Sequence, residues 1–223
     1  MGGPIFGLIN GFTSGSIEDI ITYSALIVVI LLIAFPLHEL AHAITADRFG
    51  DNTPRLAGRI TLNPFKHLSL LGSVLFLVFG FGYATTPVNP LNFRGDWRLK
   101  HAGVALAGPI ANILIAIVFA LIYRVLGSAV DPTSGSWVSI ALFVCVLSVQ
   151  INLFLACFNL IPIPPLDGST ILMAFASEGV RNAFMQFGQY GWLIVAGLAQ
   201  TRILSMLINP PVQAMFNLLI PRF

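Results

Sequence analysis

The sequence predicts an all-α integral membrane protein, a multi-pass helix bundle with about five or six membrane segments. Of its 223 residues, 57% are hydrophobic and only 9% are charged, whereas soluble domains carry about a quarter charged residues. Apolar stretches long enough to cross a bilayer recur along the chain. The formal net charge of +2 is too small to indicate a nucleic-acid partner. We therefore expect the lipid bilayer to surround the protein.

The expected membrane segments follow one another, joined by short polar loops. Residues 20–46 form the first. Residues 67–82 are apolar but short for a full crossing, and the stretch after them is rich in Pro and Asn, so this segment either spans or dips in and returns. Further spans are expected at residues 99–126, 137–160 and 184–208. Beyond Pro210 and Pro211, a short apolar tail is expected to lie along the interface.

The whole chain, residues 1–223, is expected to form a single membrane-embedded domain. Its core covers about residues 20–175, and a C-terminal span and tail cover about residues 184–223. Cys145 and Cys157 lie in one expected span, where a cysteine usually packs as a small hydrophobic residue. They therefore give no indication of a redox compartment.

A small β or re-entrant element is expected near the active site. Residues 56–62 alternate apolar and polar side chains, a pattern that suits a strand better than a helix. The short apolar segment at residues 67–82 and the loop at residues 85–93 follow it.

The basic residues predict the orientation of the bundle. Seven of the eleven lie between the first expected span and the span at residues 99–126, namely Arg48, Arg55, Arg59, Lys66, Arg94, Arg98 and Lys100. Cytoplasmic loops carry an excess of Lys and Arg, so this region is expected to face the cytoplasm. We expect the plasma membrane of a prokaryote, with the site described next lying toward its cytoplasmic leaflet.

A metal-binding pattern lies inside the first expected span, where residues 38–42 read HELAH. Residues four apart share one face of a helix, so His38 and His42 can present two imidazoles to one Zn²⁺ ion. Glu39 then lies beside the metal without binding it, where it can take a proton from a zinc-bound water. The alternative is three polar residues satisfied within a helix bundle, but ionisable residues at membrane depth are usually functional.

A catalytic zinc ion needs a third protein ligand and an open position for water. Asp167 is the best candidate, because it follows the proline-broken end of the span at residues 137–160 and lies at the same predicted depth as the histidines. The alternative for Asp167 is a turn or helix cap after the prolines.

Three segments together resemble a known family. They are HELAHA at residues 38–43, GPIAN at residues 108–112, and NLIP at residues 159–162 leading to PLDG at residues 165–168. These segments resemble those of the site-2 proteases, a family of intramembrane zinc metalloproteases. Within that family, the chain is similar to the minimal subgroup that lacks PDZ and CBS domains. The resemblance covers about residues 20–175.

The resemblance implies an endopeptidase with one zinc ion per chain, held by His38, His42 and Asp167, with Glu39 as the catalytic residue. It implies that the substrates are transmembrane segments of other proteins. Asn159 matches a family asparagine near the metal that donates a hydrogen bond to the oxyanion or the substrate, although a bond between helices is an alternative.

An unwound substrate needs an edge to hold it, and residues 56–62 and 85–93 are candidates for one, although they could also merely connect helices. The candidate substrate contacts are Thr61, Asn63, Asn89 and Asn112. For Asn112, close packing with one interhelical bond is the favoured interpretation. The chain departs from the subgroup at residues 82–85, which read GYAT where a glycine-tryptophan-alanine-lysine stretch is expected.

Three other functions use the same polar site. A metal transporter needs ligands at successive depths, whereas the donors here cluster at one level. A non-catalytic adaptor that binds transmembrane helices would not require the complete set of ligands and Glu39. A zinc hydrolase acting on lipid remains open on the motif chemistry alone.

Overall fold

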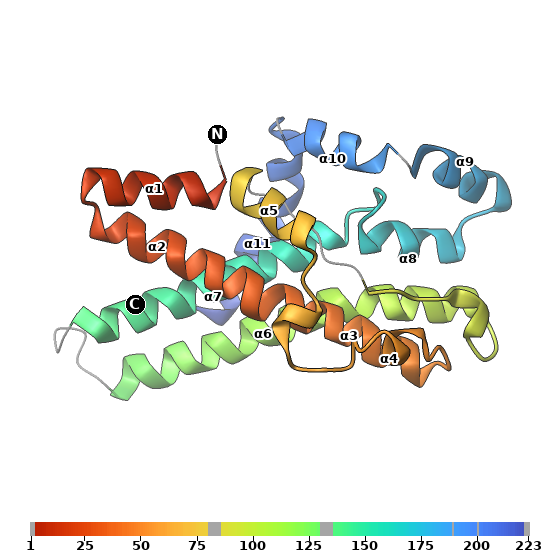
Figure 1. Cartoon of the computed structure of the whole chain (residues 1–223), viewed down its shortest axis with the longest axis horizontal. Helices are drawn as coiled ribbons and strands as arrows, with labels where there is room; N and C mark the ends of the chain where they lie inside the picture. The colour runs from red at the N-terminus through yellow and green to blue at the C-terminus, as the bar shows by residue number, and fades with distance from the viewer. Residues whose placement is uncertain (1–2, 80–85, 130–135, 189, 200, 221–223) are drawn as a thin grey trace.

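The computed structural model describes residues 3–79, 86–129, 136–188, 190–199 and 201–220, and it is almost entirely helical over these ranges (Figure 1). Among the described residues, three helices are long and apolar enough to cross a membrane: Ile17–Arg48, Trp97–Ser128 and Trp137–Asn159. The all-α membrane prediction is therefore confirmed. Of the five or six expected segments, these three have the length of a full crossing.

The first long helix consists of α2 (Ile17–Val28), a π-helical turn (Val29–Ala34) and α3 (Phe35–Arg48). It begins where the Ser16 side chain accepts a hydrogen bond from the backbone N–H of Asp19, 3.2 Å away. The π turn directly precedes Pro36, whose ring opposes the carbonyl four residues earlier, so a wider turn accommodates it.

Three helices form the centre of the molecule. The long α6 (Trp97–Ala129) runs antiparallel to α3 and to α7 (Ser136–Asn159), and it packs against both (Figure 1). At one end, α11 (Ile203–Leu219) packs on α7 and closes a core made by Ala116, Ala120, Val149, Leu153, Ile208 and Val212.

The span expected at residues 184–208 is wrong. Its residues are divided among α9 (Glu178–Gly188), α10 (Gly191–Ala199) and α11. Gly191 begins α10, and a Cβ on it would collide with the carbonyl of Pro164. The division between this span and a separate tail beyond Pro210 and Pro211 is also wrong, because α11 continues through both prolines, with Ile208 and Val212 buried on either side.

The expected strand at residues 56–62 is wrong as well. Helix α4 (Thr53–Leu56) precedes a run of turns and bends, with Gly58 at a φ of 68°. Leu56 and Leu62 are each 79% exposed, so the alternating pattern does not mark the buried face of a strand. The described residues contain no strand.

The segment after that loop forms a short helix, α5 (Leu70–Phe79). Its 10 described residues give a length of about 15 Å, half the thickness of a bilayer core. Residues 80–85 lie outside the described residues, so the crossing or return of this segment stays a prediction. Beside it, α1 (Pro4–Ser14) lies antiparallel on α2, and the N–H of Gly3 donates to the carbonyl of Val78 at 2.7 Å (Figure 1).

Candidate metal centre

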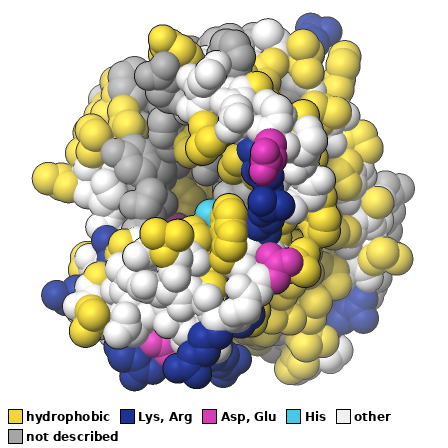
Figure 2. Space-filling model, turned by 90° about the vertical axis from the view of Figure 1, so that its right-hand side faces the viewer, with side chains coloured by type: hydrophobic (Ala, Val, Ile, Leu, Met, Phe, Trp, Pro, Cys, Tyr) yellow, Lys and Arg dark blue, Asp and Glu magenta, His cyan; other side chains and the backbone are white. Residues whose placement is uncertain are grey.

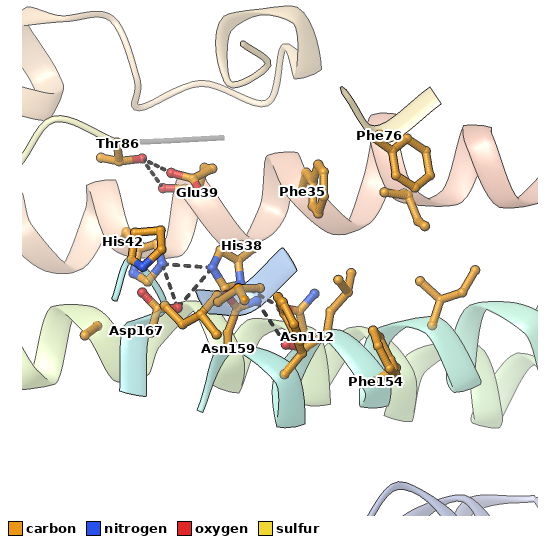
Figure 3. A pocket seen from close by; sticks show the side chains of 18 of the residues that line it. Phe35, His38, Glu39, His42, Phe76, Thr86, Asn112, Phe154, Asn159 and Asp167 are labelled. Carbon is orange, nitrogen blue, oxygen red and sulfur yellow. Dashed lines mark hydrogen bonds and ion pairs between the residues drawn. The ribbon is translucent and has the colours of Figure 1, made fainter. Parts of the chain in front are cut away.

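Three side chains from two helices converge on one point at the contact between α3, α6 and α8 (Asp167–Phe175) (Figure 3). The Nε2 atoms of His38 and His42 lie 3.0 Å apart. The Oδ2 atom of Asp167 lies 3.2 Å from the first and 3.4 Å from the second. The structure thus brings together the three residues that the sequence grouped. The two histidines share one helix face, and the turn after the prolines brings Asp167 to them.

The backbone of Gly168 allows Asp167 to reach this point. Three prolines end α7 and turn the chain, and α8 begins at Asp167. A Cβ on Gly168 would collide with the carbonyl of Leu160 at the end of α7. A residue with a side chain at this position would therefore push Asp167 away from the histidines.

A second glycine lets α6 approach the histidines. A Cβ on Gly108 would lie 2.5 Å from Nε2 of His38 and from Nε2 of His42. The GPIAN segment, which the sequence linked to close packing, therefore brings the backbone of α6 directly against the metal-binding atoms. Only glycine leaves that space free.

The other nitrogen of each ring faces an acceptor. Nδ1 of His38 lies 2.6 Å from Oδ1 of Asn112, and Nδ1 of His42 lies 2.7 Å from the backbone carbonyl of Val104. Because both partners are acceptors, each neutral ring carries its proton on Nδ1. The lone pairs of the two Nε2 atoms then face each other, and Oδ2 of Asp167 forms the third corner of a triangle with them.

This arrangement fits a zinc ion. Oδ2 of Asp167 is buried and has no hydrogen-bond partner among the described residues, and two lone pairs 3.0 Å apart repel each other. Ligand atoms about 2.0–2.2 Å from a tetrahedral zinc lie about 3.3–3.6 Å from one another, close to the separations here. Nδ1–H groups held by outer acceptors are the usual support of zinc-bound histidines.

The acceptor beside His38 is itself held by a hydrogen bond to Asn152, a partner that the sequence did not identify. Nδ2 of Asn112 donates to Oδ1 of Asn152 at 2.9 Å, and Nδ2 of Asn152 donates to the carbonyl of Ser148 at 2.9 Å. Asn112 and Asn152 are fully buried. The interhelical bond expected for Asn112 is therefore present, between α6 and α7, and it also fixes the amide that faces His38.

Glu39 lies beside the metal-binding atoms and outside their cluster (Figure 3). Its carboxylate is buried, and Oε2 accepts a hydrogen bond from Oγ1 of Thr86 at 2.7 Å. The same hydroxyl lies 3.0 Å from the backbone carbonyl of Glu39. Thr86 belongs to the loop that the sequence proposed as an edge, but no sequence argument paired it with Glu39.

The remaining predicted residues lie in two kinds of place. Asn159 lines the cavity in front of the site, and its Nδ2 donates to the carbonyl of Leu155 in its own helix at 2.9 Å. Asn63 and Asn89 use their side-chain oxygens to cap short 3-10 turns, at Phe65 N–H and Leu91 N–H. Neither these two nor Thr61 is among the described residues that line the cavity. Residues 82–85 lie outside the described residues.

The cavity in front of the three donors has a volume of about 970 Å³. Its walls come from most of the bundle and are largely apolar, with contributions from Leu26, Ile30, Phe35, Phe76, Leu147 and Phe154. Figure 2 shows a hollow with a histidine side chain in it, and Lys and Arg side chains to its sides and on the lower part of the same face. A large apolar chain can therefore lie against the polar site.

Known proteins resemble this chain over most of its length. A family model described as peptidase family M50 matches residues 25–199. The protein named “Putative zinc metalloprotease YwhC” from Bacillus subtilis is 37% identical over 190 residues, which cover 84% of this chain and 86% of that protein. Rip2 of Mycolicibacterium smegmatis and MJ0611 of Methanocaldococcus jannaschii carry the same description. The first is 30% identical over 78% of this chain and 66% of its own length. The second is 32% identical over 67% of this chain and 72% of its own length. No solved structure matches the chain.

Proposed function

Because this chain belongs to peptidase family M50, the site-2 protease family of zinc metalloproteases, we propose that it is an intramembrane endopeptidase that cuts transmembrane segments of other proteins. The observation that carries the proposal is the position of three convergent donors and a separate carboxylate at the wall of a cavity of about 970 Å³ inside an apolar bundle. A soluble peptide needs no such surroundings, whereas an apolar segment does.

His38, His42 and Asp167 would hold one zinc ion per chain. When bound, the ion acidifies a water molecule and polarises the peptide carbonyl. The clustering of the donors within 4.8 Å of one another supports a single site, rather than the series of weak sites that transport requires.

Glu39 is the residue that moves the proton. One carboxylate oxygen, Oε2, is occupied by the Thr86 hydroxyl, so the other oxygen is available to the attacking water. The carboxylate takes a proton from that water as its oxygen attacks the peptide carbon, and passes it to the departing amine nitrogen as the C–N bond breaks. Asn159 lines the same cavity and would contact the carbonyl oxygen or the substrate through its side chain.

The substrate must be unwound, since a helix hides its peptide bonds in internal hydrogen bonds. We propose that the loop at residues 86–93 holds the extended segment, because Thr86 and Val88 line the cavity beside Glu39. In this arrangement Asn89, Thr61 and Asn63 contact the substrate outside the cavity, near the interface.

The site would lie toward the cytoplasmic leaflet of the cell membrane. Helix α3 ends at Arg48, and α4 and the start of α6 bring further basic residues to the same end of the molecule, among them Arg55 and Arg98. Basic residues collect on the cytoplasmic side of membrane proteins. The hollow in Figure 2 opens beside basic side chains of this kind.

The proposal is tested by reconstituting the protein with zinc in nanodiscs and offering a panel of single-span peptides, with and without helix-breaking residues in their cytoplasmic half, alongside phospholipids. Cleavage of one or more peptides that a chelator abolishes and zinc restores is expected. Hydrolysis of lipid ester bonds alone, or no zinc-dependent cleavage of any peptide, would contradict it.

A further inference from the structure

We propose that Thr86 is a positioning residue for the catalytic carboxylate, holding one oxygen of Glu39 in place so that the other faces the substrate. The inference rests on the proposed function of Glu39. It comes from a contact between residues 47 positions apart in the chain, 2.7 Å from hydroxyl oxygen to carboxylate oxygen. A hydrogen bond to a charged acceptor is stronger than one between neutral groups.

The position of Thr86 is itself restricted by its sequence. Its β-branched side chain has few accessible rotamers, and the residue after it is Pro87, which restricts residue 86 to extended conformations. The hydroxyl carries one proton and has two acceptors on Glu39, the carboxylate at 2.7 Å and the backbone carbonyl at 3.0 Å. Both acceptors belong to the same residue, so the hydroxyl stays directed at Glu39 whichever one it contacts.

A buried carboxylate, Asp51, anchors the loop that carries Thr86. Its Oδ2 accepts the backbone N–H of Asn89 at 2.7 Å, and its Oδ1 accepts Nδ2 of Asn92 at 2.8 Å. Asp51 is 0% exposed. Its own N–H donates to the carbonyl of Ala46 at 3.0 Å, in the last turns of α3.

The contacts of Thr86 and Asp51 attach both ends of the loop at residues 86–93 to α3. Asp51 holds residues 89–92 to the end of α3, and Thr86 touches Glu39 nearer the middle of the same helix. A second backbone bond, from Arg94 N–H to the carbonyl of Phe49 at 3.0 Å, adds to the anchor. Displacing the loop would therefore move Thr86 relative to Glu39, although neither contact includes a metal-binding residue.

The test replaces the hydroxyl with a group of the same shape. Thr86→Val removes the donor, Thr86→Ser retains it, and Thr13→Val removes an exposed hydroxyl of α1 that donates to the carbonyl of Asn10 in its own helix. With a peptide that the wild-type protein cleaves, Thr86→Val is expected to lower kcat by about 10–100-fold with little change in KM. Thr86→Ser and Thr13→Val should stay within about threefold of wild type, and all three should bind zinc like wild type.

A second readout needs no cleavage. The carboxylate stretching band of Glu39, isolated by subtracting the infrared spectrum of Glu39→Gln from that of wild type, should shift in Thr86→Val and remain in Thr86→Ser. If the wild-type protein cleaves no peptide, the proposed function fails. The infrared band still tests whether Thr86 is hydrogen-bonded to Glu39. Wild-type kcat together with an unshifted band in Thr86→Val would overturn the inference.

Discussion

Oδ1 of Asn112 lies 2.6 Å from Nδ1 of His38, and both side chains are buried where α3 meets α6. The contact fixes the proton of His38 on Nδ1 and directs its Nε2 toward His42 and Asp167. Asn152 in turn fixes the amide of Asn112. Thus a residue on each of α6 and α7 helps to orient a metal-binding histidine on α3.

Removing this acceptor should weaken zinc binding. Asn112→Leu keeps a similar volume but leaves the Nδ1–H of His38 without a partner, and the zinc Kd is expected to rise by about 10–100-fold. Competition with a chelating dye in detergent measures the Kd. Ser148→Ala is the control, since that hydroxyl donates to the Val144 carbonyl of its own helix at 2.7 Å and should leave the Kd unchanged. Equal zinc affinity in wild type and Asn112→Leu would show that His38 is oriented without Asn112.

Gly108 should tolerate no side chain. In Gly108→Ala the added Cβ lies 2.5 Å from Nε2 of both histidines, so the rings must move and zinc binding should be lost or weakened by at least about 100-fold. Gly127→Ala is a matched control in the same helix, where a Cβ meets nothing within 4 Å. The control should bind zinc normally and unfold at an equal or slightly higher temperature, because alanine favours a helix by about 0.5–1 kcal/mol over glycine. Normal zinc binding by Gly108→Ala would refute the close approach.

Stability at low pH should depend on Asp51. Burial by itself would raise the pKa of this carboxyl, but hydrogen bonds from Thr53, from the N–H of Asn89 and from Asn92 outweigh it, so the pKa is lowered in the folded protein. A lowered folded pKa stabilises the protein above the unfolded value of about 3.9, and that contribution is lost as the pH falls through the folded pKa.

The comparison with Asp51→Asn isolates this contribution. The wild-type protein should melt at a higher temperature than the variant at pH 7 and 5, and the difference should shrink below about pH 4. Asp47, paired with Arg55 at 2.6 Å, titrates in both proteins, and only the repulsion from Asp51, the smallest of the influences on its pKa, differs between them. Thermal unfolding of both proteins in detergent at each pH measures the difference in melting temperature. A difference that stays constant down to pH 3 would contradict the assignment.

Much of the fold could be predicted because long apolar runs specify membrane helices directly. The run at residues 184–208 is divided among three helices, and Gly191 within it lies against the carbonyl of Pro164, a tertiary contact that hydropathy does not encode. The alternation at residues 56–62 failed because Leu56, at the end of α4, and Leu62, in a bend, are both exposed. Period-2 patterns indicate strands only where one face is buried.

The donors of the site could be predicted from their chemistry, whereas their supports could not. His38 and His42 follow from helical spacing, and Asp167 was the best-placed carboxylate. Thr86 was missed because its partner Glu39 is 47 residues away, and no local pattern connects them. Asn152 could have been found, since it lies in an apolar span seven residues before Asn159, on the same helix face, and polar residues at membrane depth usually have a role.

The central claim, that Glu39 carries out proton transfer without holding the metal, is tested most directly by Glu39→Gln in the 223-residue chain. Zinc content and peptide cleavage are measured on the same purified sample in nanodiscs. The variant is expected to retain about one zinc per chain, because His38, His42 and Asp167 are unchanged, and to cleave no peptide that the wild type cuts. Retained cleavage by the zinc-loaded variant, or loss of its zinc, would contradict the account.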